Sequence, residues 1–103
     1  MKIPYRPITR VKDMLEAMGQ QMAYAYDDLV FPENTAFLLQ MGKEGRDLFV
    51  HFNRESIESE RLPILQQLKS AGAKQSLKVR VKGLYNLEPT ENNELKIEFH
   101  PLQ

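Results

Sequence analysis

Residues 34–53 read as two short apolar strands joined by a polar loop, and this hairpin limits the possible folds more than any other stretch. Side chains on one face of such a hairpin pair across the two strands. The predicted core-facing pairs are Phe37 with Phe52, Leu39 with Val50, and Met41 with Leu48. This register leaves residues 43–46 as a four-residue loop, which suits Gly42 and Gly45 because glycine tolerates a positive φ.

The opposite face of this hairpin is only half polar. It carries Ala36, Leu38, Gln40, Phe49, His51 and Asn53. A strand pair with one solvated face should alternate cleanly, so Leu38 and Phe49 indicate that something covers this second face too. Two explanations stay open: a segment of the same chain covers it, or it is a surface for a second copy or a ligand.

Length and composition predict one globular domain over residues 1–103. The chain is 42% hydrophobic and 27% charged, with a net charge of zero and no cysteine. A disulfide framework and thiolate catalysis are therefore excluded. No apolar run approaches the roughly 18 residues of a membrane span, and no apolar leader opens the chain, so we expect no membrane partner and a cytoplasmic location.

Two amphipathic helices are predicted. Pro4 and Pro7 favour an extended amino-terminal arm over residues 1–8, and Thr9 is a plausible N-cap for the first helix. Its apolar positions are Val11, Met14, Leu15, Met18 and Met22. For the second helix, the N-cap is either Ser59 or a residue nearer Leu62, and Gly72 is expected just past the end. Its apolar positions are Leu62, Ile64, Leu65, Leu68 and Ala71.

The remaining strands follow from alternation. Residues 75–84 and 95–99 each present one apolar face, with a loop over residues 88–93 between them. Odd residues should pair with odd ones, which places Glu98 opposite or diagonal to Lys82. Residues 23–26 fit either the end of the first helix or a strand, and residues 28–31 are expected to form a short third strand.

These elements predict an α+β fold with two layers. Two helices pack on a mostly antiparallel sheet of four to five strands, in the order α-β-β-(β)-α-β-β. This order is similar to that of a ferredoxin-like unit beginning one element late, and to that of small secretion-chaperone-like dimers. Neither similarity is accompanied by a family motif, so neither assigns a function.

Few residues are arranged for chemistry. The two histidines, His51 and His100, lie on different hairpins and no pair has the spacing of a preformed metal clamp, so no metal or cofactor is expected. The serines sit where hydroxyls usually cap backbone, and no nucleophile elbow or phosphate loop occurs. A carboxylate and histidine site near Asp27, Asp28 and His51 is the one catalytic arrangement left open.

Nucleic-acid binding is the main alternative to protein binding. The basic residues Lys74, Lys78, Arg80 and Lys82 could form a row along one strand, extended by the basic amino-terminal arm. No aromatic residue is interleaved with them for base stacking, and Tyr85 lies just beyond. The simpler explanation is a solvated strand face neutralised by Glu98.

The favoured hypothesis is a non-catalytic protein-interaction module. We expect it to self-associate as a homodimer, or to bind another protein partner. The expected interaction surface is the second face of the hairpin, formed by Leu38, Gln40, Phe49 and His51, with residues 24–31 at its rim. The reason is that two helices cover only one face of a small sheet, which leaves apolar surface on the other face.

Overall fold

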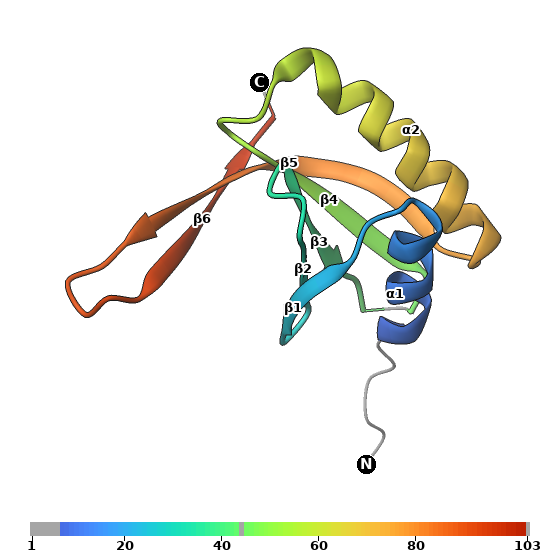
Figure 1. Ribbon diagram of the computed structural model, residues 1–103, viewed down its shortest axis with the longest axis horizontal. Helices are drawn as coiled ribbons and strands as arrows, with labels where there is room; N and C mark the ends of the chain where they lie inside the picture. Colours follow the sequence, from blue (N-terminus) through green and yellow to red (C-terminus); the bar gives the residue numbers. More distant parts are fainter. Residues whose placement is uncertain (1–6, 44, 103) are drawn as a thin grey trace.

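The structure is a computed structural model and describes residues 7–43 and 45–102. Two helices and six strands follow one another along the chain (Figure 1). Their bounds are α1 Ile8–Ala17, β1 Met22–Tyr26, β2 Leu29–Pro32, β3 Phe37–Met41, β4 Asp47–Asn53, α2 Glu58–Lys74, β5 Lys78–Pro89 and β6 Leu95–Pro101.

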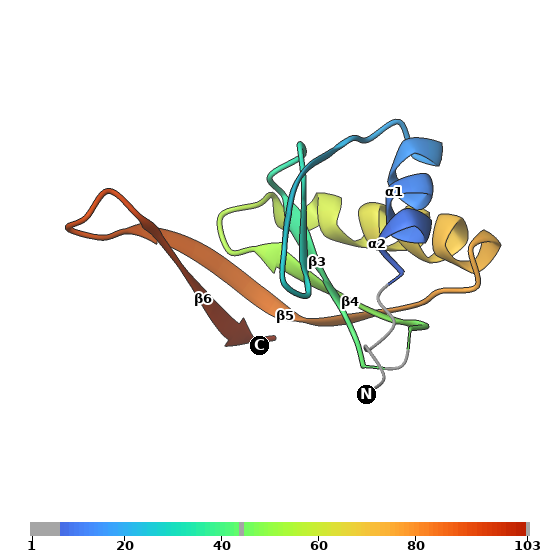
Figure 2. The same ribbon diagram turned by 90° about the horizontal axis from the view of Figure 1, so that it is seen from below.

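All six strands form one mixed sheet in the order in which they occur in the chain. Neighbours are antiparallel except β4 and β5, which run parallel because α2 connects them. The sheet is curled, and the distal part of the β5–β6 hairpin projects away from the body of the molecule (Figures 1 and 2). We call this hairpin, residues 83–101, the arm.

The predicted α+β class with two helices is confirmed, but the strand count, the order and the simple two-layer packing are not matched. The sheet is curled and has six strands rather than four or five, and four of them precede α2. The additional strand is β1, whose residues the sequence left open as either the end of the first helix or a strand. Gly19 has a φ of 78°, and the backbone N–H of Gln20 donates to Leu15 O at 2.8 Å, which ends the helix early. Met22 therefore begins a strand instead of continuing α1.

The core lies between the two helices and one face of the sheet. Its buried members are Val11, Met14, Leu15, Val30, Phe37, Leu39, Met41, Leu48, Val50, Phe52, Leu68, Leu77 and Val79. The three predicted pairs across the β3–β4 hairpin are confirmed residue by residue. Because the register is as predicted, the second face of this hairpin also carries the expected side chains.

The helix ends differ from those expected. Helix α1 begins at Ile8 with Pro7 at the N-cap, so Thr9 does not cap it, and residues 1–6 of the predicted arm lie outside the described residues. Helix α2 begins at Glu58 with Ile57 at the N-cap. Within the described residues neither helix start has a side-chain capping hydrogen bond, so the positions of Thr9 and Ser59 did not predict where the helices begin.

Gly72 is a helix residue rather than the residue past the end. It is buried inside α2, and a Cβ added there would lie 2.7 Å from Val79 Cγ2 and 3.4 Å from Met14 Sδ. Helix α2 can therefore approach β5 closely only because position 72 has no side chain.

We expect Gly72→Ala to lower the free energy of unfolding by about 1 kcal/mol, because overpacking against the stiff Val79 outweighs the better helix propensity of alanine. In a Val79→Ala background the same change should be neutral or stabilising, since the obstructing methyl is gone. Denaturant unfolding of the four proteins measures both effects. A Gly72→Ala protein more stable than the parent would show that the contact is not tight.

Strand β5 pairs with β4 along its first part and with β6 along its last part. Its residues from Lys78 to Tyr85 pair with β4, and those from Gly83 to Pro89 pair with β6. Val50 pairs with Val81 but His51 pairs with Gly83, so Lys82 is an extra residue that shifts the alternation. The odd residues of the arm therefore lie on the same sheet face as His51.

Candidate functional site

The sheet face opposite the helices is the one that sequence analysis singled out, and its centre is closed. Leu38 is fully buried and His51 is 3% exposed. The Phe99 ring of β6 lies over the imidazole of His51, with ring centroids 4.5 Å apart. Part of the second face is thus covered by the chain itself, which is the simpler of the two explanations left open by the sequence.

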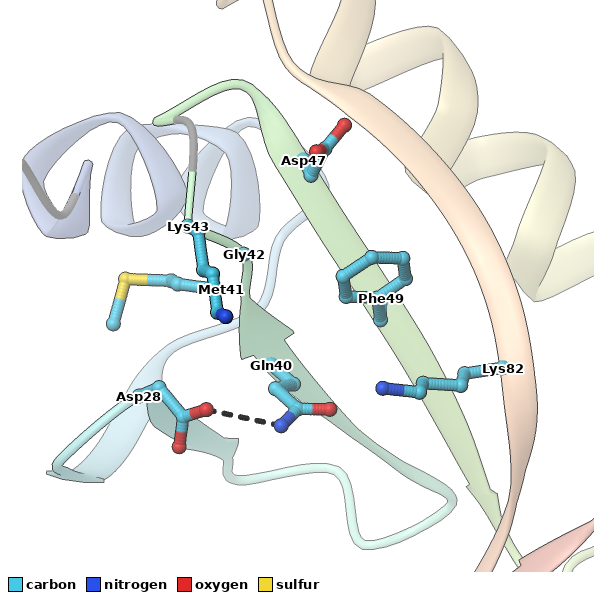
Figure 3. A pocket seen from close by; sticks show the side chains of 8 residues that line it. All are labelled: Asp28, Gln40, Met41, Gly42, Lys43, Asp47, Phe49 and Lys82. Carbon is cyan, nitrogen blue, oxygen red and sulfur yellow. Dashed lines mark hydrogen bonds between the residues drawn. The ribbon is translucent and has the colours of Figure 1, made fainter.

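A chain of hydrogen bonds on this face joins the β1–β2 turn to strands β3 and β4. Gln40 Nε2 donates to Asp28 Oδ2 at 2.9 Å, and Gln40 Oε1 lies 2.9 Å from His51 Nε2 (Figure 3 shows the first bond). The carboxylate can only accept, so it holds the amide with its oxygen toward the imidazole. His51 Nε2 must then carry the hydrogen and donate it to Gln40.

The other imidazole nitrogen has no partner. His51 Nδ1 is buried and makes no hydrogen bond within residues 7–43 and 45–102. Protonating it would place a donor without an acceptor in a dry site beside the ammonium of Lys82. Burial first, and then the charge of Lys82, lower the pKa of His51 from 6.5 to about 4, although Asp28 acts in the opposite direction.

A shallow polar pocket lies beside this chain (Figure 3). It has a volume of about 440 Å³ and is lined by Asp28, Gln40, Met41, Gly42, Lys43, Asp47, Phe49 and Lys82. The Lys82 ammonium lies 4.9 Å from the centroid of the Phe49 ring, a cation–π contact. The lining includes the carboxylate of Asp28 but not His51, which is linked to Asp28 through Gln40.

A larger apolar groove opens farther along the same face, between the β1–β2 hairpin and the arm. Its volume is about 860 Å³, and its lining is Tyr24, Tyr26, Leu29, Phe31, Leu87, Thr90, Glu94, Leu95, Lys96 and Ile97. On one wall the rings of Tyr24 and Phe31 are in contact, with centroids 5.9 Å apart. Tyr26 and Leu95, one on each wall, are each 65% exposed. We call this feature the groove.

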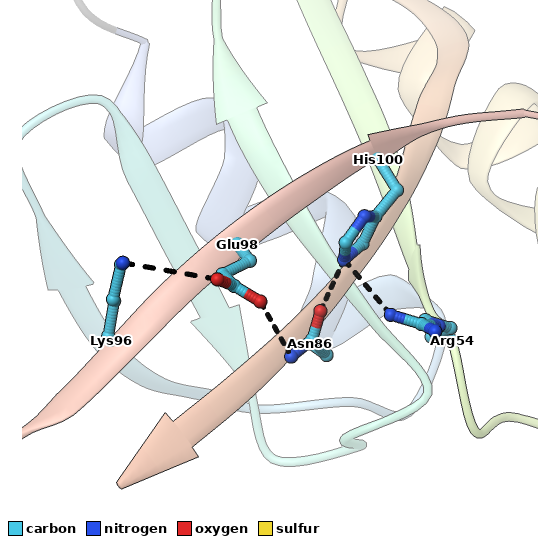
Figure 4. Close-up of polar contacts among 5 residues, drawn as sticks. All are labelled: Arg54, Asn86, Lys96, Glu98 and His100. Carbon is cyan, nitrogen blue, oxygen red and sulfur yellow. Dashed lines mark hydrogen bonds and ion pairs between the residues drawn. The ribbon is translucent and has the colours of Figure 1, made fainter. Parts of the chain in front are cut away.

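The opposite face of the arm is polar. Asn86 Nδ2 donates to Glu98 Oε1, Asn86 Oδ1 bonds His100 Nε2, and Arg54 Nη1 lies 3.3 Å from the same His100 nitrogen (Figure 4). Arg54 follows β4, so these contacts link the base of the arm to the body. The arm is therefore amphipathic, with its apolar face turned toward the groove.

The four residues predicted to form the interaction surface divide into two pairs. Leu38 and His51 are buried and cannot contact a partner in this arrangement, whereas Gln40 and Phe49 are partly exposed at the polar pocket. Apolar surface stays open at the predicted rim, Tyr24 and Tyr26, and on the arm at Leu87, Leu95 and Phe99, which were not predicted to form an interaction surface. In the sequence, the alternation of Tyr24 and Tyr26 was the signal that two aromatic side chains share one strand face.

The basic residues are only partly collected into a row. Lys78, Arg80 and Lys82 are exposed on the second face of β5, but Lys74 is the last residue of α2. The predicted pairing of odd residues between β5 and β6 is confirmed, yet Glu98 lies opposite Asn86, and its ion pair is with Lys96 at 3.9 Å. The expected neutralisation of Lys82 by Glu98 is therefore wrong, because β6 starts its pairing beyond Lys82.

The candidate catalytic residues Asp28 and His51 are linked through Gln40, whereas Asp27 occupies the β1–β2 turn with a φ of 55°. No three His, Asp or Glu side chains of the described residues are grouped to hold a metal ion. No helix in the same part of the chain is long and apolar enough to cross a bilayer. Comparison with family models, curated proteins and solved structures found no match.

Proposed function

We propose that this protein is a non-catalytic interaction module that self-associates through its second sheet face, with the groove as the contact surface. The observation that supports this most is the pair of exposed apolar walls, Tyr24 and Tyr26 on one side and Leu87 and Leu95 on the other. In this proposal the protein needs no cofactor and acts in the cytoplasm, as expected from the sequence.

The exposed walls have a physical cost that a partner would remove. A two-stranded hairpin is only marginally stable in water, and the distal arm has no helix over it (Figure 2). Burial of apolar surface is worth about 25 cal/mol per Å², and a stable interface removes roughly 800 Å² from each partner. The arm and the β1–β2 hairpin together offer apolar surface on both sides of a preformed hollow.

A second copy of this chain is the partner that fits these walls. A two-fold dimer places the same patch on both subunits, so apolar walls that lack a cover in one copy cover those of the other. The chain has no net charge, so two copies do not repel each other as a whole. Protrusion of the arm also lets each subunit reach across the two-fold axis.

Paired glutamate substitutions test the groove. Leu95→Glu should weaken dimerisation at least about tenfold, because it places a charge in the centre of an apolar contact. The matched control is Leu62→Glu on α2, which changes a leucine of similar exposure, 62% against 65%, away from the groove. Sedimentation equilibrium of both variants and the parent gives the dimerisation constants.

The two variants can fail the proposal in different ways. Equal dimerisation constants for Leu95→Glu and the parent would remove the groove as the contact surface. A loss caused equally by Leu62→Glu would show that the effect is one of general charge. Circular dichroism confirms that each variant is folded before its mass is interpreted.

A further inference from the structure

The edge of β5 is open over its first half. Strand β6 pairs with β5 only from Gly83 to Pro89, whereas β4 borders the other side from Lys78 onward. Residues 78–82 of β5 therefore have a strand neighbour on one side and none on the other within the described part of the chain. The open segment lies in line with β6, so an added strand would continue the row that β6 begins.

The backbone groups that face this edge can be assigned. The N–H of Lys78 donates to Arg46 O of the loop that leads into β4, at 2.6 Å. In a parallel ladder, alternate residues direct their backbone groups to the same neighbour, so Lys78 and Arg80 bond toward β4. Val79 and Val81 then direct their N–H and C=O groups toward the open edge, where a further strand could pair with them.

The side chains along this edge are basic and favour a partner strand of negative charge. Lys78, Arg80 and Lys82 are exposed on the second face, and none forms an ion pair with an acidic side chain among residues 7–43 and 45–102. Basic residues on an edge oppose the pairing of two identical edges, because like charges would lie side by side. The same row favours a strand of opposite charge, since cross-strand ion pairs replace that repulsion.

We propose that the edge of β5 over residues 78–82 binds an acidic extended peptide of another protein as an added strand. Acidic side chains of the peptide lie beside Lys78, Arg80 and Lys82 on the second face. Its alternate residues lie on the helix face, next to Val79 and Val81, and are apolar and β-branched. The recognised chemistry is thus an alternation of acidic and branched apolar residues, at a site separate from the groove.

Nucleic acid fits this edge less well. Phosphates would satisfy the three cations, but no aromatic side chain is interleaved between Lys78 and Lys82 to stack on bases. The ring of Phe49 lies beneath the Lys82 ammonium and is not free to stack on a base there. A bare strand edge also offers backbone donors and acceptors that a peptide backbone matches in spacing.

Fluorescence anisotropy with a labelled peptide of alternating glutamate and valine tests the proposal on the 103-residue chain. Binding should weaken as salt is raised from about 50 to about 300 mM, because the contact is ionic. A peptide of the same composition with its glutamates and valines in separate blocks should bind at least about tenfold more weakly, since it cannot pair in alternation. Arg80→Glu should weaken binding by a similar factor, and the control Lys69→Glu on α2 should not.

Amide hydrogen exchange gives a second readout that requires no variant. In the free protein the amides of Val79 and Val81 should exchange faster than those of Lys78 and Arg80, and the peptide should slow them selectively. Absence of binding at low salt, or equal binding of the two peptides, would overturn the proposal. Salt-sensitive binding of single-stranded or duplex oligonucleotides in place of the peptide would overturn it in favour of nucleic acid. A finding that the protein is monomeric would contradict self-association through the groove, but it would not affect peptide binding at the edge of β5.

Discussion

Acidification from about pH 7 to about pH 4 is expected to cost the folded state about 3 kcal/mol through His51 alone. The pKa of His51 is lowered from 6.5 to about 4, so between these values the unfolded chain binds a proton that the folded chain rejects. The stability that depends on neutral His51 is fully present above pH 6.5, the pKa in the unfolded chain. It is lost as the pH falls toward the folded-state pKa of about 4. Stability should therefore rise with pH across this window.

The variant His51→Gln isolates this effect, because glutamine can still hydrogen-bond Gln40 but does not titrate. The difference in free energy of unfolding between the parent and His51→Gln should change by about 3 kcal/mol in favour of the variant as the pH falls from about 7 to about 4. Urea unfolding at a series of pH values measures the difference, in which the shared carboxylates cancel. Parallel pH profiles for the two proteins would contradict a neutral, buried His51.

The same histidine can be followed directly. Ring resonances of His51 should titrate well below its ordinary pKa, and Lys82→Gln should raise that pKa because it removes the nearby positive charge. Asp28→Asn should lower it, since Asp28 is the group that favours the protonated form. Opposite signs for these two variants distinguish electrostatic control from a general loosening of the site.

Gly83→Ala is expected to lower the free energy of unfolding by about 2–3 kcal/mol and to release the base of the arm. A Cβ on residue 83 would collide with the carbonyl oxygen of His100, a backbone atom of β6 that cannot move alone. The change should therefore separate β5 from β6 where the arm leaves the body. Loss of the arm would also remove Phe99 from above His51.

Hydrogen exchange locates this damage. Amides of β6 should lose protection in Gly83→Ala, while those of β3 and β4 keep most of theirs, because the helix-side core does not depend on the arm. Glu88→Ala, on the exposed distal part of the same hairpin, serves as the control and should change stability by less than about 0.5 kcal/mol. Unchanged protection of β6 would show that the close approach at Gly83 is readily relaxed.

The sequence predicted best where a local pattern and burial agree. The β3–β4 register follows from alternation and a four-residue loop, and each of the three predicted pairs occurs. The end of α1 could not be found in the same way, because Met22 continues the helical spacing. The helix ends before Met22, where Gly19 adopts a positive φ that the hydrophobic spacing does not indicate.

Features that depend on two distant segments escaped prediction. The extra residue at Lys82 is defined by pairing with β4, and it decides which side chains of the arm share a face with His51. Burial of His51 likewise depends on β6, because the ring of Phe99 lies against the imidazole. Sequence analysis indicated that the second face of the sheet is partly apolar, but the covered centre and the open groove required the tertiary structure.

The mass of the unmodified protein in solution tests the central proposal most directly. Sedimentation equilibrium over a wide range of protein concentration should show the mass rising from 12.0 kDa to twice that value. The exposed tyrosines Tyr24 and Tyr26 should become protected from solvent quenchers over the same range. A constant mass of one chain up to the highest concentration reached would contradict self-association through the groove.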